Sequence, residues 1–166
     1  MKKKHPKLSV ERTGVDHLLE GTAGLLALVP AVYLLLNWGA LPEAAPAHIG
    51  PDGLVDRWGS KGELVILPIV VLLDFILLAV MQRFPHTYNY LVRITEENAP
   101  VQYRIAVSMM GWMNLILSAG LSALFFSMVD LAVRGSDRMA VWVMPVFMGS
   151  LFGCLWYFLA KSWRER

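Results

Sequence analysis

The sequence predicts an all-α integral membrane protein, a polytopic four-helix bundle with both termini in the cytoplasm. Apolar residues make up 56% of the 166 residues and charged residues only 17%, whereas about a quarter of a typical soluble domain is charged. The charged residues also gather in short blocks between long uncharged runs. This distribution indicates a membrane protein, and residues 1–166 are expected to form a single membrane domain.

Four apolar stretches are long enough to cross the hydrocarbon core of a bilayer, which takes about 20 helical residues. They cover residues 18–38, 64–81, 105–133 and 139–160. Tryptophan and tyrosine lie near several ends of these stretches, as expected at a membrane interface. The main connections are an extracytoplasmic loop at 39–63 and a cytoplasmic loop at 82–104.

Lysine and arginine give the expected orientation. Eleven of them lie in the N-terminal tail, the 82–104 loop and the C-terminal tail, and four lie in the other two connections. Cytoplasmic connections carry the excess of positive charge, so both termini are expected in the cytoplasm and the 39–63 loop outside. The expected location is the cell membrane, and the basic N-terminal tail is expected to contact anionic lipid.

The outer loop carries two local signals. "GPDG" at 50–53 predicts a tight turn. "SKGE" at 60–63 has the spacing of a capping box, in which Ser60 accepts from a backbone N–H near Glu63 and Glu63 reaches back. The second helix is therefore predicted to begin at Ser60.

Several polar side chains of the outer loop are candidates for ligand binding. They are His48, Asp52, Asp56, Arg57 and Lys61. They could pair with one another as a structural cap, or form a recognition surface for a peptide or a lipid headgroup. A metal site is not predicted, because no clean ligand spacing is present and the two neighbouring cations would oppose a metal ion.

The segment "LPEAAPAHIGPDGLVDRWGSK" resembles the extracytoplasmic signature of the SdpI-like membrane proteins. The matching residues are Pro42, Pro46, His48, Gly53, Asp56, Gly59, Ser60 and Lys61. The cytoplasmic segment "FPHTYNYLVRITEENAPVQYR" is similar to that family at Asn89, Tyr90, Ile94, Thr95, Glu97 and Asn98. Ile49 and Gly50 depart from the pattern, since such proteins often have asparagine after the histidine.

This resemblance implies a role in immunity against a secreted killing factor, which family members couple to signalling by holding a repressor at the membrane. Members with both roles tend to have additional spans, so the signalling role is not carried over to a chain with four. What remains is recognition of, or resistance to, a peptide or amphiphile at the outer loop.

Polar residues inside the predicted spans suggest a second function. Asp74 is the charged residue that lies well inside a span, and Asn114 and Ser150 fall at a similar depth on the third and fourth helices. A shared hydrogen-bonded cluster is expected, because lipid offers a carboxyl group no partner. The cluster could simply join the helices, or Asp74 could serve a small proton- or ion-coupled transporter.

The predicted cytoplasmic face offers further contacts. Asp16, His17 and Glu20 are expected to meet Arg83, His86 or Arg93 of the inner loop. Asn98, followed by a proline at position 100, predicts the start of the third helix. The 82–104 loop is the expected surface for a cytoplasmic regulator. Gly149 and Gly153 could support helix packing or a homo-oligomer.

The composition also disfavours several classes of function. The formal net charge of +2 is too small to indicate nucleic-acid binding, and the lone cysteine, Cys154, excludes an intrachain disulfide and any multi-cysteine metal site. The sequence has no nucleophile–base pair, phosphate loop or two-histidine metal motif, so neither an enzyme nor a cofactor is predicted. The expected partners are the lipid bilayer and an external peptide toxin or amphiphile.

Overall fold

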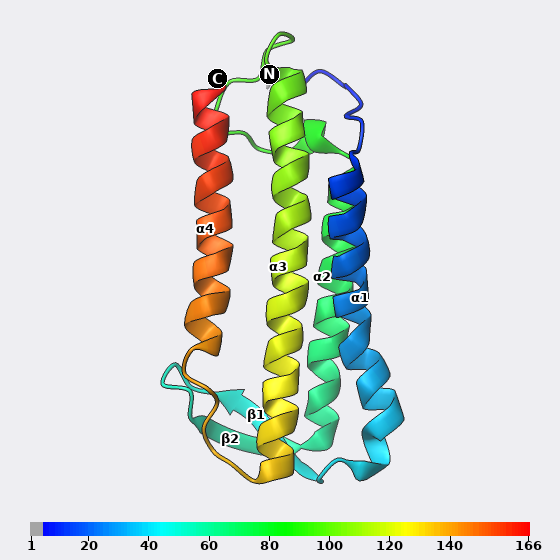
Figure 1. Cartoon of the computed structure of the whole chain (residues 1–166), viewed down its shortest axis with the longest axis vertical. Coiled ribbons are helices and arrows are strands. Elements are labelled where there is room, and N and C mark those ends of the chain that lie inside the picture. The colour runs from blue at the N-terminus through cyan, green and yellow to red at the C-terminus, as the bar shows by residue number, and fades with distance from the viewer. Residues whose placement is uncertain (1–4) are drawn as a thin grey trace.

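A computed structural model describes residues 5–166, which form four long helices and one β-hairpin (Figure 1). The helices are α1 (Gly14–Asn37), α2 (Ile66–Met81), α3 (Ala99–Arg134) and α4 (Val143–Arg164). The hairpin pairs β1 (Ala44–Ile49) with β2 (Val55–Ser60), and short 3₁₀ turns lie at η1 (Trp38–Ala40), η2 (Lys61–Val65) and η3 (Pro85–Thr87). Each long helix, counted with its adjoining 3₁₀ turn where it has one, is long and apolar enough to cross a membrane.

The four predicted apolar stretches each coincide with one helix, so the mostly helical fold class is confirmed. The all-α prediction missed the hairpin, which occupies much of the 39–63 loop. The hairpin lies across one end of the bundle, here called the hairpin end (Figure 1). Residue 166, the beginning of the described chain and the 82–98 connection lie at the opposite end, here called the terminal end.

Helix α1 begins four residues before the predicted span because a capping box precedes it. The Thr13 backbone N–H donates to Asp16 Oδ2 at 2.7 Å, and the Asp16 backbone N–H donates to Thr13 Oγ1 at 3.3 Å. These reciprocal bonds satisfy backbone donors that the first turn leaves free. Helix α3 begins directly after Asn98, as predicted.

Helical structure begins directly after Ser60, as predicted, but the predicted capping box does not form and the first turns are 3₁₀. Ser60 caps the 3₁₀ turn η2 without a side-chain hydrogen bond, and the α-helical geometry begins only at Ile66. The Glu63 carboxylate instead accepts a hydrogen bond from the Arg57 guanidinium at 2.9 Å. The carboxylate that the capping box requires is therefore bound to Arg57 in place of the Ser60 backbone N–H.

Helix α3 contacts each of the other three helices and lies between α4 and the α1–α2 pair (Figure 1). Its buried polar side chains satisfy backbone carbonyls of neighbouring helices. Asn114 Nδ2 donates to the carbonyl of Phe75 in α2 at 3.2 Å, and Ser122 Oγ donates to the carbonyl of Leu26 in α1 at 2.8 Å. These bonds fix how α1 and α2 sit against α3.

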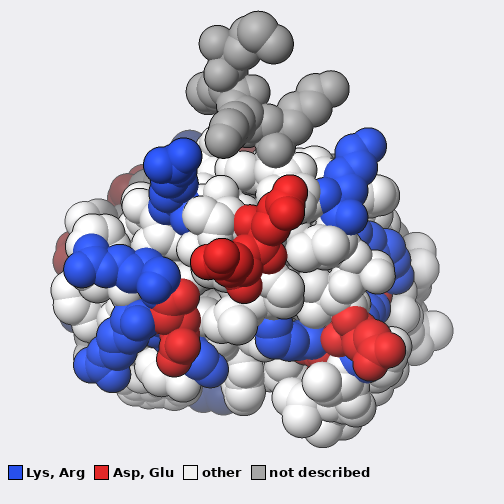
Figure 2. Space-filling model, turned by 90° about the horizontal axis from the view of Figure 1, so that it is seen from above, with Lys and Arg blue, Asp and Glu red and all other residues white. Residues whose placement is uncertain are grey.

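Ion pairs join the helices at the terminal end. Buried Asp16 accepts a hydrogen bond from Arg104 of α3, and Glu20 pairs with Arg12 and, at 3.4 Å, with Arg83. The predicted contact of Glu20 with Arg83 is thus confirmed, whereas Asp16 pairs with Arg104 and His17 is exposed. Seen from above, this end carries basic and acidic side chains among uncharged ones (Figure 2).

Tyrosines organise the connection between α2 and α3. Tyr88 Oη donates to the Met81 carbonyl at 2.6 Å, and Tyr90 lies between Tyr88 and Tyr103 in a run of aromatic contacts. Burial raises the pKa of Tyr88 to about 12, so its hydroxyl stays a hydrogen-bond donor at neutral pH.

The packing of α4 on α3 predicts an asymmetric effect of two glycine substitutions. A Cβ atom added at Gly120 would overlap the buried ring of Phe147, whereas one added at Gly149 meets nothing within 4 Å. Gly120→Ala should lower the free energy of unfolding by about 1–3 kcal/mol, a typical cost of overpacking. Gly149→Ala should be neutral or stabilising, because alanine favours the helix. Thermal unfolding in detergent measures both, and equal melting temperatures would contradict the packing described.

Candidate functional site

The hairpin is an antiparallel pair closed by a glycine turn. Gly53 has a φ of +79°, which favours glycine, and its N–H donates to the Gly50 carbonyl at 2.9 Å. Asp52 Oδ1 accepts from the Leu54 N–H at 3.1 Å, which stabilises the turn. The pairing is irregular on either side of His48. Such bulges change the direction of side chains relative to a regular ladder.

The hairpin is anchored to the rest of the fold on two sides. The Val55 N–H donates to the Asp137 carbonyl at 2.7 Å, and the Met139 N–H donates to the Gly53 carbonyl at 2.9 Å. These bonds join the hairpin to the α3–α4 connection. On the other side, fully buried Ala45 belongs to a hydrophobic cluster with residues of α1, η2 and α3. The hairpin is therefore held in place over the ends of the helices.

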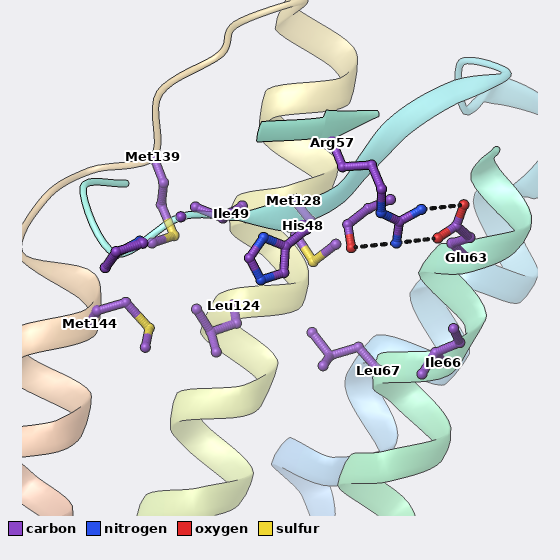
Figure 3. A pocket seen from close by; sticks show the side chains of 13 residues that line it. His48, Ile49, Arg57, Glu63, Ile66, Leu67, Leu124, Met128, Met139 and Met144 are labelled. Atoms are coloured by element: carbon purple, nitrogen blue, oxygen red, sulfur yellow. Dashed lines mark hydrogen bonds and ion pairs between the residues drawn. The ribbon is translucent and has the colours of Figure 1, made fainter. Parts of the chain in front are cut away.

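A pocket of about 500 Å³ lies beneath the hairpin, between α2, α3 and α4 (Figure 3). Its walls are mainly apolar, and its side chains come from the hairpin, η2, the three helices and the α3–α4 connection. The apolar lining includes Ile49, Ile66, Leu67, Leu124, Met128, Met139 and Met144. Methionine side chains are flexible and polarisable, so they can adapt to ligands of different shape.

Charged and polar groups lie on the hairpin side of this pocket. The Arg57 guanidinium pairs with Glu63 at 2.9 Å and also donates to the Ala47 carbonyl at 3.3 Å (Figure 3). His48 Nδ1 lies 2.7 Å from Asp56 Oδ1. The side chains of His48 and Arg57 are more than half exposed, at 62% and 57%. Exposed ion pairs contribute little to stability, so a ligand could exchange partners with these groups at small cost.

The candidate residues of the outer loop divide into three groups. His48 and Arg57 line the pocket, and Asp56 contacts His48. Asp52 stabilises the turn. Lys61 does not line the pocket, because its ammonium group pairs with Glu43 at 2.8 Å and lies over the Trp38 ring. Among residues 5–166, no group of three or more His, Cys, Asp or Glu side chains could hold a metal ion.

Sequence reasoning missed Glu63 and the methionines of the pocket. Glu63 was assigned to a capping box, although its spacing from Arg57 also allows an ion pair across the strand end. Met128, Met139 and Met144 lie far from the hairpin in the sequence. The sequence feature that could have indicated them is the concentration of methionines in and near the α3–α4 connection.

The predicted intramembrane cluster does not include Ser150. Ser150 is exposed on α4, and its hydroxyl donates to the Val146 carbonyl of its own helix at 2.8 Å. Asn114 is fully buried and binds the backbone of α2 beside Asp74, at Phe75. Asp74 is partly buried, and its Oδ2 atom has no hydrogen-bond partner within residues 5–166.

Two comparisons with known proteins give a match, and the family match includes the hairpin. Residues 25–72 match the family model of a domain of unknown function, DUF1648. These residues cover the second half of α1, the whole hairpin and the first part of α2. The chain is also similar to a protein of Archaeoglobus fulgidus that is named "Uncharacterized protein", with 26% identity over 131 residues. The match covers 70% of this chain and 72% of that protein. No solved structure matches.

The turn of the hairpin predicts a specific cost for one substitution. Gly53→Ala places a side chain in a left-handed conformation and brings its Cβ to 3.3 Å from the Met139 carbonyl oxygen. We expect a loss of about 1–2 kcal/mol in the free energy of unfolding. Gly39→Ala is the control, because Gly39 lies at the same end in open space without a positive φ. Thermal unfolding of both variants measures the difference, and an unchanged melting temperature for Gly53→Ala would contradict the turn geometry.

Proposed function

We propose that the chain is a membrane protein that binds an amphiphile or amphipathic peptide in the pocket beneath its hairpin. The observation that carries this proposal is the pocket itself, with apolar walls of adaptable methionines and a polar mouth formed by Arg57, Glu63 and His48. Ligand pockets typically have volumes of about 300–1,000 Å³, mainly apolar walls and a few placed polar groups. The apolar part of the ligand lies between the helices, and its polar part meets the hairpin.

The proposed orientation puts the terminal end in the cytoplasm and the hairpin end outside. It is supported by the excess of lysine and arginine at the terminal end, because cytoplasmic connections carry more positive charge. The apolar side chains exposed along the four helices support insertion in a bilayer, for example Leu36, Leu73 and Phe152. In this orientation an external amphiphile reaches the pocket from the outer leaflet.

The resemblance to SdpI-like proteins supports a role in immunity or in sensing envelope stress. Two of the matching residues belong to the region of the pocket. His48 lines the pocket, and Asp56 contacts His48. A protein that binds a membrane-active peptide at this position would remove the peptide from the outer leaflet before it inserts. On the opposite side, the 82–104 loop is the proposed surface for a cytoplasmic regulator.

A proton-coupled or ion-coupled transporter is the second candidate. It is favoured by Asp74, whose Oδ2 atom has no hydrogen-bond partner within the described chain. An ionisable group inside a membrane span is commonly functional. In a transporter of this kind, transport would require Asp74 and would not require the hairpin pocket. Variants of Asp74 and of the pocket residues therefore separate the two proposals.

Binding of a fluorescent amphiphile tests the proposal. Dansylated undecanoic acid should bind the purified wild-type protein in detergent with an increase in dansyl emission. Leu67→Trp fills the pocket, and Arg57→Gln removes the cation at its mouth; each should raise the Kd about tenfold, equal to about 1.4 kcal/mol. Leu73→Trp is the matched control, because Leu73 is 62% exposed and does not line the pocket.

Two outcomes would contradict amphiphile binding at the hairpin. Leu67→Trp, Arg57→Gln and Leu73→Trp could all give the wild-type signal, which would show that the probe reports only partition into the micelle. Alternatively, Asp74→Asn could abolish a proton flux in proteoliposomes while the pocket variants retain it, which would favour the transporter. Amphiphile binding predicts that Asp74→Asn binds the probe like the wild type.

A further inference from the structure

A second groove lies between α3 and α4 in the half of the bundle nearer the terminal end. Its volume is about 450 Å³. It is lined by Ser108, Trp112, Ile116, Cys154, Tyr157, Phe158 and Lys161. None of these residues belongs to the pocket beneath the hairpin. The groove is therefore a separate feature of the molecule.

The polar groups of this groove lie at one end of it. Ser108 and Lys161 are the lining residues nearest the terminal end on α3 and α4 respectively. The Ser108 hydroxyl accepts a hydrogen bond at 2.9 Å from Arg104, whose charge is offset by Asp16. Lys161 is exposed and makes no ion pair with any residue from 5 to 166. Its charge is available to an anion.

The rest of the groove is aromatic and aliphatic. On α3 the lining continues from Ser108 to Trp112 and Ile116, a rise of about 12 Å along the helix. On α4 it continues from Lys161 through Tyr157 to Cys154. Trp112 and Tyr157 are 43% and 58% exposed, so their rings line an open channel and are not part of a closed core. The groove thus has a cationic end followed by an apolar channel parallel to the helices.

We propose that this groove binds one acyl chain of an anionic phospholipid of the cytoplasmic leaflet, with the phosphate beside Lys161. The inference rests on the membrane orientation given under Proposed function and does not depend on the hairpin pocket. A basic side chain near the membrane surface favours acidic lipids, and an apolar channel along the helix axis matches the direction of a lipid chain. A free phosphate ion would leave the apolar part of the groove empty.

Quenching by brominated lipid tests this site. The full chain is mixed in micelles with brominated phosphatidylglycerol or brominated phosphatidylcholine, and tryptophan emission is recorded. The groove's signal is the part of the quenching that disappears in Trp112→Phe. For this signal, the anionic lipid should reach half-quenching at a lower mole fraction than the zwitterionic lipid.

Two charge variants separate a specific site from a general surface effect. Lys161→Gln should raise the half-quenching mole fraction for phosphatidylglycerol about fivefold and remove the preference over phosphatidylcholine. Lys7→Gln removes the same charge from an exposed position at the same end, outside the groove, and should change the value less than twofold. Both replaced side chains are exposed, so neither substitution disturbs packing.

The proposal is overturned if both brominated lipids quench the Trp112 signal equally, or if Lys161→Gln and Lys7→Gln behave alike. It is also overturned if the groove's signal reports a second copy of the chain, seen as dimer formation that Trp112→Phe abolishes. Dansylated undecanoic acid binding is measured on the same Lys161→Gln protein. If Lys161→Gln binds this probe like the wild type, the hairpin pocket is intact in that variant. A negative result for the lipid site then does not count against the hairpin pocket.

Discussion

The arrangement of the molecule depends on α3, the helix that contacts each of the other three. Its small and polar face lets α1 and α2 approach closely, and Asn114 and Ser122 bond to their backbone carbonyls. Arg104 near its start neutralises buried Asp16 of α1. Without Arg104, the buried Asp16 carboxylate would keep its hydrogen bonds from Thr13 but lose its charged partner. Because the hairpin and α4 also pack on α3, any shift of this helix would alter both proposed binding sites.

The two cavities follow from the same geometry. Helix α4 packs on one flank of α3, and α2 packs on another (Figure 1). At the hairpin end the space between α2, α3 and α4 is covered by the hairpin and forms the methionine-lined pocket. Toward the terminal end, the α3–α4 flank remains open as the groove with Lys161 at its rim. A single bundle thus offers a covered pocket at one end and an open groove at the other.

The helices could be predicted from the sequence because long apolar runs have few alternatives to helix. The start of α1 was missed because it depends on two side chains, Thr13 and Asp16, outside the apolar run. The hairpin was missed because Pro46 and several glycines obscure a strand pattern, and its pairing depends on bonds to the α3–α4 connection. Ser150 shows a different limit. Residue counting gave its depth, but rotation about the α4 axis points it away from α3.

The candidate site was predicted only in part, because its residues come from separate parts of the chain. His48 and Arg57 were identified because they lie in one patterned loop. The apolar walls come from three helices, and only the fold brings Leu67, Leu124 and Met144 together. Lys61 matched the same pattern but serves the structure, because Glu43 and Trp38 hold it outside the pocket.

Both proposed sites depend on the proposed orientation, in which the hairpin end faces the outside of the cell. Its most direct test uses a Cys154→Ser background with one new cysteine in each protein, at exposed Ala44 of β1 (Ala44→Cys) or at exposed Glu96 of the terminal end (Glu96→Cys). A membrane-impermeant maleimide should label Ala44→Cys in intact cells and label Glu96→Cys only after permeabilisation. Labelling of Glu96→Cys from outside, with Ala44→Cys protected, would contradict the account.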